Sequence, residues 1–324
     1  MSAAITLPWG VELCHLPSPF PLVRGGTLDG AVLAYERQGP QHAPVVVVLG
    51  GISAHRHVSA HAALPERGWW EGVAGPGLGV DTSRFQVLSF DWLGGAGNST
   101  TPDRGEAFPF VDVRDQARAL WALCDALRVD QVHAIVGCSY GGMVAQQAAA
   151  QQPRRCGRLV SIAAAHRSHA QASAWRHVQR QLVELGLRRG DGGRELELAR
   201  ALAMTTYRSP DELRERFDGG LDDDRLAGWL DARGSSFADA WNAEQFLCCN
   251  RSIDAHRVDP RELRVPTFVC AFDSDQLVPP ADVRELALAL PDLRGHRELR
   301  TLYGHDGFLK ETKAVSAFVR EALR

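Results

Sequence analysis

Hydrophobic residues in the first half of the chain occur in short continuous runs, which polar or glycine-rich segments separate. The valine-rich run Pro44–Gly51 is typical of a strand that is buried on both faces, as in a parallel sheet. The same texture predicts further strands at Ala31–Arg37, Phe85–Asp91, Gln131–Val136, Arg158–Ala165, Val265–Phe272 and Arg297–Tyr303.

Between these runs the hydrophobic positions follow a helical repeat. In the segment Val111–Val129 one helical face carries Val113, Ala117, Leu120, Trp121, Cys124 and Leu127. Two more helices are predicted, at Gly142–Gln152, which stops before Pro153, and at Ala281–Pro291. Because strands and helices alternate, we expect a mainly parallel sheet that helices cover on both sides.

The pattern changes between His166 and about Asp254. This segment is polar, rich in arginine and helical in its periodicity, and no run in it has the pattern of a buried strand. We therefore predict a helical cap that is inserted into one core. Residues 1–165 are expected to form the first part of the core, residues 166–255 the cap, and residues 256–324 the second part of the core.

Composition narrows the class of protein. Its hydrophobic content of 45% and charged content of 23% are ordinary for a globular chain of 324 residues. The net charge of −3 gives no reason to expect nucleic acid or an anionic membrane surface as a partner. No apolar stretch approaches the length of a membrane span, and the N-terminal segment lacks the basic start of a signal peptide.

The seven cysteines are scattered and include no Cys-x-x-Cys pair. Neither a zinc site nor a disulfide framework is therefore predicted, and no metal is expected. Reduced thiols in a cytoplasmic protein fit this pattern best.

The segment Gly137-Cys138-Ser139-Tyr140-Gly141 fits the pattern G-x-S-x-G, between a predicted strand and a predicted helix. On such a turn the serine hydroxyl projects above the edge of the sheet, and the N-terminal end of the helix favours developing negative charge. The alternative is an ordinary strand-to-helix turn. Cys138 could also be the nucleophile, but its position before the serine suits a small buried packing residue better.

A nucleophilic serine needs a base, and the base needs an acid that orients it. We expect His305 to be the base, because it lies in a loop after the predicted strand Arg297–Tyr303, whereas His296 would precede that strand. The acid should follow the strand before it, where the loop offers Asp273 and Asp275. The pattern favours Asp275 only slightly.

Acyl chemistry also needs backbone N–H groups that stabilise an oxyanion. One should come from Tyr140, directly after the serine. The other should come from the loop "GGISA" after the strand Pro44–Gly51, where Ile52 is the expected donor.

Several longer motifs together resemble the homoserine O-acetyltransferase family, which also contains homoserine and serine O-succinyltransferases. They are "GGISAHRHV", "GWWEGVAGPGLGVDTSRFQVLSFDWLGG", "GNSTTPD", "GCSYGGMVA", "TTYRSPDELRERF", "SDQLVPP" and "GHDGFL". The Gly-Trp-Trp and Gly-His-Asp-x-Phe-Leu pieces are much more specific than G-x-S-x-G. The matching stretches run through most of the predicted core.

The resemblance implies an α/β-hydrolase fold and a ping-pong transfer of an acetyl or succinyl group from acyl-CoA to the hydroxyl of L-homoserine, in methionine biosynthesis. It assigns the nucleophile to Ser139, the base to His305 and the orienting acid to Asp275, with Ile52 and Tyr140 as oxyanion donors. Acyl-CoA is then a co-substrate, and no permanently bound cofactor is implied. A dimer interface on the cap is also implied, although the sequence alone does not show one.

The resemblance further implies two groups that hold the acceptor amino acid. Asp306 would bind its amino group, and Arg180 would pair with its carboxylate through a guanidinium fork. For Arg180 the alternative is a solvated arginine on a cap helix. The chain departs from the family at Tyr140, where methionine is usual, and it lacks the family's Gly-x-Tyr soon after the arginine.

These departures concern the choice of donor and acceptor more than the chemistry. A serine O-acyltransferase for cysteine synthesis is one alternative, because pockets discriminate a single methylene by only about 1–3 kcal/mol. An esterase that uses water as acceptor is another, since the same triad serves both reactions. A binding protein without catalysis is the third.

Overall fold

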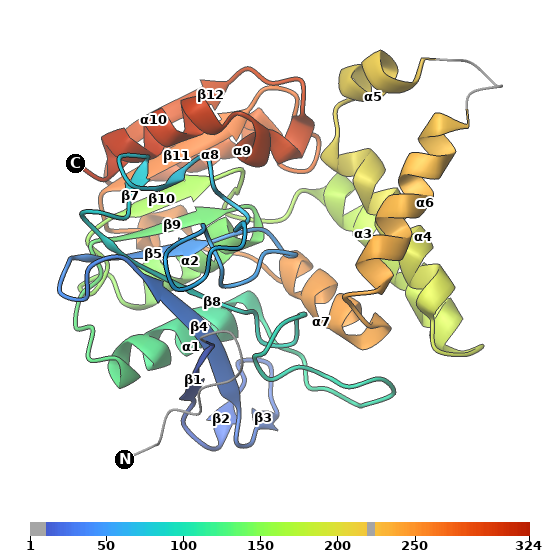
Figure 1. Ribbon diagram of the computed structural model, residues 1–324, viewed down its shortest axis with the longest axis horizontal. Helices are drawn as coiled ribbons and strands as arrows, with labels where there is room; N and C mark the ends of the chain where they lie inside the picture. The colour runs from blue at the N-terminus through green and yellow to red at the C-terminus, as the bar shows by residue number, and fades with distance from the viewer. Residues whose placement is uncertain (1–10, 219–223) are drawn as a thin grey trace.

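An eight-stranded sheet lies at the centre of the structure, a computed structural model that describes residues 11–218 and 224–324 (Figure 1). The strand order is β1-β4-β8-β5-β9-β10-β11-β12. β4 is antiparallel to both its neighbours, and all other neighbours pair in parallel, so the predicted mainly parallel sheet is confirmed. Residues 1–10, which bear on the signal-peptide prediction, lie outside the described residues.

The strands of this sheet are β1 (Glu12–His15), β4 (Val32–Gln38), β5 (Val45–Leu49), β8 (Gln86–Phe90), β9 (Ala134–Cys138), β10 (Leu159–Ile162), β11 (Thr267–Phe272) and β12 (Leu293–Leu299). Two short pairs lie outside it: β2 (Phe20–Pro21) with β3 (Thr27–Leu28), and β6 (Ala74–Gly75) with β7 (Val80–Asp81).

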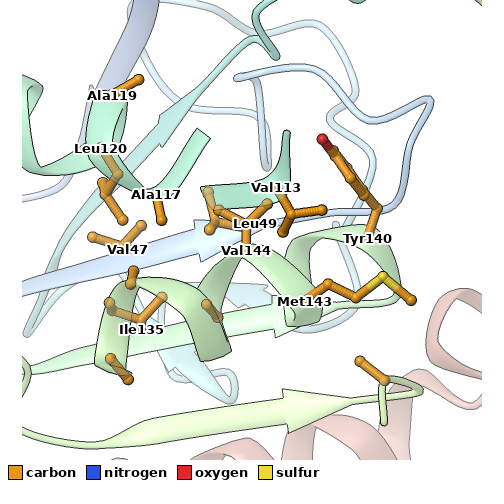
Figure 2. Packing of buried hydrophobic residues seen from close by; sticks show 14 of the residues in the cluster. Val47, Leu49, Val113, Ala117, Ala119, Leu120, Ile135, Tyr140, Met143 and Val144 are labelled. Carbon is orange, nitrogen blue, oxygen red and sulfur yellow. The ribbon is translucent and has the colours of Figure 1, made fainter. Parts of the chain in front are cut away.

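Helices cover both faces of the sheet. Successive residues of a strand point to opposite sides, so the apolar strands carry hydrophobic side chains on both faces, and both must be covered. Val47 and Leu49 of β5 pack in one hydrophobic cluster with α1 (Val113–Ala126), α2 (Tyr140–Gln151) and α8 (Pro280–Ala289). Figure 2 shows this packing around β5, α1 and α2. On the other face, Val46 and Val48 pack with α10 (Thr312–Ala322). The continuous valine run of the sequence is explained by this two-sided burial.

The start of α1 is fixed by its own polar residues. Asp112 and Asp115 form a capping box, in which the Asp112 carboxylate accepts from the Arg114 N–H and Asp115 accepts from the Asp112 N–H, both at 2.9 Å. Each bond satisfies a backbone donor that a helix N-terminus would otherwise leave unpaired.

The last strand differs from its prediction. It spans Leu293–Leu299 rather than Arg297–Tyr303, so His296 lies within β12, opposite Val269, and does not precede the strand. β12 is an edge strand with largely exposed or half-buried side chains, and it therefore lacks the apolar run of an inner strand. Thr301 belongs to the following loop, where its N–H donates to Asp273 Oδ1 at 2.9 Å.

Between β10 and β11 the described residues form only helices as regular elements. They are α3 (Ala170–Leu187), α4 (Gly193–Tyr207), α5 (Pro210–Phe217), α6 (Arg225–Ala238) and α7 (Ala243–Asp254). Figure 1 shows α3, α4, α5 and α6 beyond one side of the sheet. A separate hydrophobic cluster joins α3, α4, α6 and α7, and it includes Val183, Leu196, Phe237 and Phe246.

We propose that this helical unit is the cap of residues 166–255, inserted into a core of residues 1–165 and 256–324. Residues 1–10 and 219–223 of these ranges lie outside the described part. Short turns and helices complete the second part of the core, at Pro260–Glu262, Gly304–Asp306 and α9 (Gly307–Lys310). In the described residues, no helix combines the length and the apolar character that crossing a membrane requires.

Candidate active site

Ser139 occupies a strained turn between β9 and α2. Its φ of 54° and ψ of −120° lie in a region that residues other than glycine rarely adopt. Backbone hydrogen bonds hold the turn on both sides: the Ser139 N–H donates to Ile162 O and the Gly141 N–H to Gly50 O, both at 2.9 Å. The strain is therefore maintained by the neighbouring strands, and the hydroxyl stands at their carboxyl ends.

The glycines around Ser139 are required by close backbone approach. A Cβ atom on Gly137 would lie 2.2 Å from Gly141 O, and one on Gly141 would lie 2.3 Å from Leu49 O. Neither position has room for a side chain unless the backbone moves. β5, β9 and α2 can meet this tightly only because both residues are glycine.

Ser139, His305 and Asp275 form one hydrogen-bonded chain. Ser139 Oγ lies 2.7 Å from His305 Nε2, and His305 Nδ1 lies 2.6 Å from Asp275 Oδ2. The other oxygen, Asp275 Oδ1, accepts from the N–H groups of Leu277 and Val278 at 2.8 and 3.0 Å. With Nδ1–H donating to Asp275, Nε2 is free to accept the proton of the serine hydroxyl.

The charge environment of His305 suits a base. Burial alone would lower the pKa of His305, but the charge and hydrogen bond of the Asp275 carboxylate outweigh it and raise that pKa above its ordinary value. Asp273 does not reach the histidine, because its carboxylate binds the Thr301 N–H instead. Cys138 is fully buried, and burial raises the pKa of its thiol well above the usual range.

The two expected oxyanion donors come from two segments of the core. Ile52 lies in the loop after β5, and Tyr140 begins α2 directly after Ser139. The amides of Ser139 and Gly141, on either side of Tyr140, are paired with other backbone groups. The N–H groups of Ile52 and Tyr140 have no hydrogen-bond partner within residues 11–218 and 224–324. The Tyr140 side chain points elsewhere, and its hydroxyl lies 2.8 Å from Ser252 Oγ.

Two cavities meet at Ser139 and His305. We call the one with more empty space up to the open solvent, about 790 Å³, the larger cavity, and its cap lining includes Trp175, Arg176 and Gln179. The other, called the smaller cavity, has about 640 Å³ counted in the same way and is lined by Gly51, Trp69, Asp306 and Phe308, among others. Ile52, Arg200 and Tyr207 border both cavities.

Asp306 lines the smaller cavity, next to His305. Its Oδ2 lies 3.0 Å from Arg208 Nη2, and burial raises the pKa of the carboxyl, although the charges of Arg208 and His305 oppose this. Its second oxygen, Oδ1, has no hydrogen-bond partner among the residues that the structure describes.

Arg180 does not line either cavity, contrary to the expectation that it meets a substrate carboxylate. Its Nη1 donates to Asn250 Oδ1 and Asp254 Oδ2, both at 2.6 Å. The guanidinium is thus bound within the cap. The role of Arg180 at a substrate carboxylate stays a prediction, which the lining of the two cavities does not support. The sequence does not tell which face of α3 the packing of α7 covers.

Three further residues line the cavities without having been predicted from the sequence: Arg200, Tyr207 and Trp69. The guanidinium of Arg200 lies over the rings of Tyr207 and Phe237, at 5.3 and 4.7 Å from their centroids, and makes no ion pair with any described residue. A signal did exist for two of these residues, since Trp69 lies in the Gly-Trp-Trp motif and Tyr207 in the "TTYR" motif.

One group of side chains has the composition of a metal site. Ligand atoms of Glu36, His57 and His61 lie within 4.8 Å of one another, and Glu36 Oε1 lies 2.9 Å from His57 Nδ1 and 3.0 Å from His61 Nε2. None of the three lines either cavity at Ser139. These contacts also satisfy the geometry of a buried ion-pair network, and the expectation of no metal stays a prediction.

Comparison with known proteins agrees with this geometry. A family model described as the α/β hydrolase fold matches residues 44–312. A homoserine O-succinyltransferase from Xanthomonas campestris pv. campestris is 42% identical over 298 residues, which cover 90% of this chain and 79% of that protein.

Two solved structures share the fold at lower identity. A homoserine O-acetyltransferase from Bacillus anthracis superposes with a TM-score of 0.88 at 17% identity, covering 97% of this chain and 98% of that one. Esterase E22 superposes with a TM-score of 0.86 at 20% identity, covering 97% and 100%. At these identities the superpositions report the fold alone, and the same fold carries both a transferase and an esterase.

Proposed function

Because this chain belongs to the homoserine O-acyltransferases, a family of the α/β hydrolase fold, we propose that it transfers an acyl group from acyl-CoA to the hydroxyl of L-homoserine, a step of methionine biosynthesis. One observation carries the proposal. The Ser139–His305–Asp275 chain opens into a cavity bordered by Arg200, a cation without an ion pair in the described residues, and by the carboxylate of Asp306.

In the first half of the reaction Ser139 Oγ attacks the thioester carbonyl while His305 Nε2 takes its proton. Asp275 holds the ring and stabilises the imidazolium that forms. The N–H groups of Ile52 and Tyr140 then stabilise the oxyanion of the tetrahedral intermediate. CoA leaves with the proton from His305, and the acyl group remains on Ser139.

In the second half the acceptor must outcompete water, which requires that its hydroxyl be held at His305. The zwitterionic end of homoserine carries both signs of charge. We assign its carboxylate to Arg200 and its ammonium to Asp306 Oδ1. His305 removes the hydroxyl proton, and the collapse of the second tetrahedral intermediate releases O-acyl-homoserine and restores the Ser139 hydroxyl.

An esterase and a serine O-acyltransferase are the competing interpretations. The triad serves all three reactions equally, and esterase E22 shares the fold. The charge pair at the smaller cavity argues against water as the physiological acceptor, because water needs neither Arg200 nor Asp306. Serine differs from homoserine by one methylene, a difference that a pocket discriminates by about 1–3 kcal/mol.

The test measures CoA release from acetyl-CoA and from succinyl-CoA, each with homoserine, with serine and without an amino acid. Release that depends on homoserine supports the proposal, and serine-dependent release supports the second interpretation. Equal release in the absence of an amino acid would identify a hydrolase and overturn the proposal.

A further inference from the structure

The larger cavity presents a cation that the acceptor does not use. Three arginines line this cavity: Arg167, Arg176 and Arg200. Arg167 binds Glu285 through both of its terminal nitrogens, at 2.6 and 2.7 Å, and Arg200 also borders the smaller cavity, where the acceptor is assigned. Arg176 lines the larger cavity and is absent from the lining of the smaller one.

Arg176 is held rigidly on α3. Its Nε donates to Asp254 Oδ1 at 2.7 Å, and its Nη2 donates to Ser168 Oγ at 2.6 Å and Ser173 Oγ at 3.3 Å. Its third nitrogen, Nη1, has no hydrogen-bond partner within residues 11–218 and 224–324. The side chain is only 10% exposed, so this free donor belongs to a guanidinium that packing has already oriented.

The charges around Arg176 do not balance. Asp254 pairs with Arg176 through Oδ1 and with Arg180 through Oδ2, at 2.7 and 2.6 Å, so that two cations share one anion. Burial lowers the pKa of Arg176, although the charge of Asp254 opposes this. A buried excess of positive charge favours an anionic ligand. Asp282 also lines this cavity, but no ion pair joins it to Arg176 in the described residues.

We propose that Nη1 of Arg176 binds the terminal carboxylate of a succinyl group, so that the larger cavity selects succinyl-CoA over acetyl-CoA as the acyl donor. This inference rests on the proposed function. The succinyl carboxylate stands two methylenes beyond the carbonyl that Ser139 attacks, on the donor side of the site. An acetyl group has no carboxylate that could bind Arg176, so the excess positive charge remains unpaired. Arg180, the arginine singled out in the sequence, holds Asp254 behind this subsite.

The deciding experiment compares kcat/KM for the two donors at saturating homoserine in the natural protein, Arg176→Gln and Arg176→Lys. Arg167→Gln is the matched control, since it removes another arginine of the same cavity whose terminal nitrogens are bound to Glu285. We expect the natural protein to prefer succinyl-CoA. Arg176→Gln should lower its kcat/KM for succinyl-CoA by about 10- to 100-fold, the value of a charge-assisted hydrogen bond, and change that for acetyl-CoA by less than about threefold.

The control and the conservative variant separate recognition from a structural effect. Arg176→Lys should restore part of the succinyl preference, and Arg167→Gln should leave the ratio of the two donors unchanged. An equal loss with both donors in Arg176→Gln would mean that Arg176 only supports the cap, and would overturn the inference. So would a natural protein that prefers acetyl-CoA, although the proposed function would survive that result.

If neither donor gives homoserine-dependent release of CoA, the proposed function is overturned. A binding measurement still tests the inference in that case. Calorimetry of Ser139→Ala and of Ser139→Ala with Arg176→Gln would compare succinyl-CoA with acetyl-CoA in proteins that cannot be acylated. Tighter binding of succinyl-CoA that is lost with Arg176 supports the subsite. The same affinity for both donors in both proteins overturns it.

Discussion

The proposed active site has two walls that are built in different ways. The core wall consists of loops at the carboxyl ends of β5, β9, β11 and β12, and it carries Ser139, Asp275 and His305. The side chains of these three residues are bound to one another or to backbone amides. The cap wall comes from α3, α4 and α7 and carries arginines with a free donor or no ion pair in the described residues.

This difference indicates a division of labour. A wall whose groups already satisfy each other is preorganised for a fixed reaction. A wall whose arginines have a free donor or no ion pair in the described residues favours the binding of a substrate with a negatively charged group. The comparison therefore predicts that changes in the core wall abolish turnover with every substrate, whereas changes in the cap wall alter which substrate is used.

Replacing the nucleophile should give the largest effect. Ser139→Ala removes the atom that carries the acyl group, and we expect kcat to fall by at least about 10⁴-fold with either donor. Mass spectrometry after mixing with acyl-CoA should show no acyl-protein, while circular dichroism remains that of the natural protein. Cys138→Ala is the control, and retention of most activity there would exclude the thiol as nucleophile.

The acid of the triad should follow closely. Asp275→Asn leaves the shape intact but no longer stabilises the imidazolium, so kcat should fall by about 10³- to 10⁴-fold, as in other triads. Asp273→Asn is two residues away and changes a carboxylate that accepts from the Thr301 N–H, at 2.9 Å. Steady-state kinetics of the two variants would contradict the assignment if Asp273→Asn lost more activity than Asp275→Asn.

The tight turn of the core wall can be tested through stability. A Cβ on Gly141 would lie 2.3 Å from the Leu49 carbonyl oxygen, so Gly141→Ala should cost about 3 kcal/mol or more of the free energy of unfolding. Gly228→Ala lies in α6, where a Cβ meets no atom of the described residues within 4 Å, and should stabilise the protein by about 0.5–1 kcal/mol. Urea denaturation measures both, and a similar change in the two variants would contradict the turn geometry.

The cap wall should respond selectively. Arg200→Gln removes the cation assigned to the homoserine carboxylate, and we expect KM for homoserine to rise by about 10- to 100-fold with either donor, with a smaller change in kcat. Arg180→Gln is the comparison, because that guanidinium binds Asn250 and Asp254 and lines neither cavity. A larger increase of KM in Arg180→Gln would reverse the assignment of the two arginines.

The two walls also differ in how far the sequence predicts them. Ser139, Asp275 and His305 could be found because each follows a strand, and the carboxyl ends of parallel strands meet at one edge of the sheet. Although β12 begins and ends earlier than predicted, His305 still lies in the segment that follows this strand. Local order along the chain therefore determines this wall.

The cap wall depends on helix packing, which the chain order does not reveal. Arg176 and Arg180 are one helical turn apart on α3 and share Asp254, yet only Arg176 lines the cavity. Arg200 and Tyr207 come from a different helix, α4, and meet the triad only because α3 and α4 pack together beside α7. A sequence motif marks these segments as similar to the family but does not say which side chain faces Ser139.

The smallest predicted effect is a shift in the pKa of His305, which groups on both walls influence. Burial lowers this pKa, the Asp275 carboxylate raises it more strongly, and the Arg176 charge on the cap lowers it again. His305 must be neutral to accept the serine proton, so kcat/KM should fall with decreasing pH along an acid limb whose apparent pKa lies above that of an ordinary histidine. The pH profile of acetyl-CoA turnover should therefore move to a higher pKa in Arg176→Gln and to a lower one in Asp275→Asn.

The sign for stability is opposite to the sign for activity. Since the pKa of His305 is higher in the folded protein, protonated His305 stabilises the fold. That contribution is complete below the pKa of the unfolded chain and is lost as the pH rises through the folded value, which is where the enzyme becomes active. A denaturation series against pH should show the decline in the natural protein and not in His305→Ala. An acid limb that Arg176→Gln leaves unmoved would mean that the cap charge does not reach the base, and that the two walls act independently.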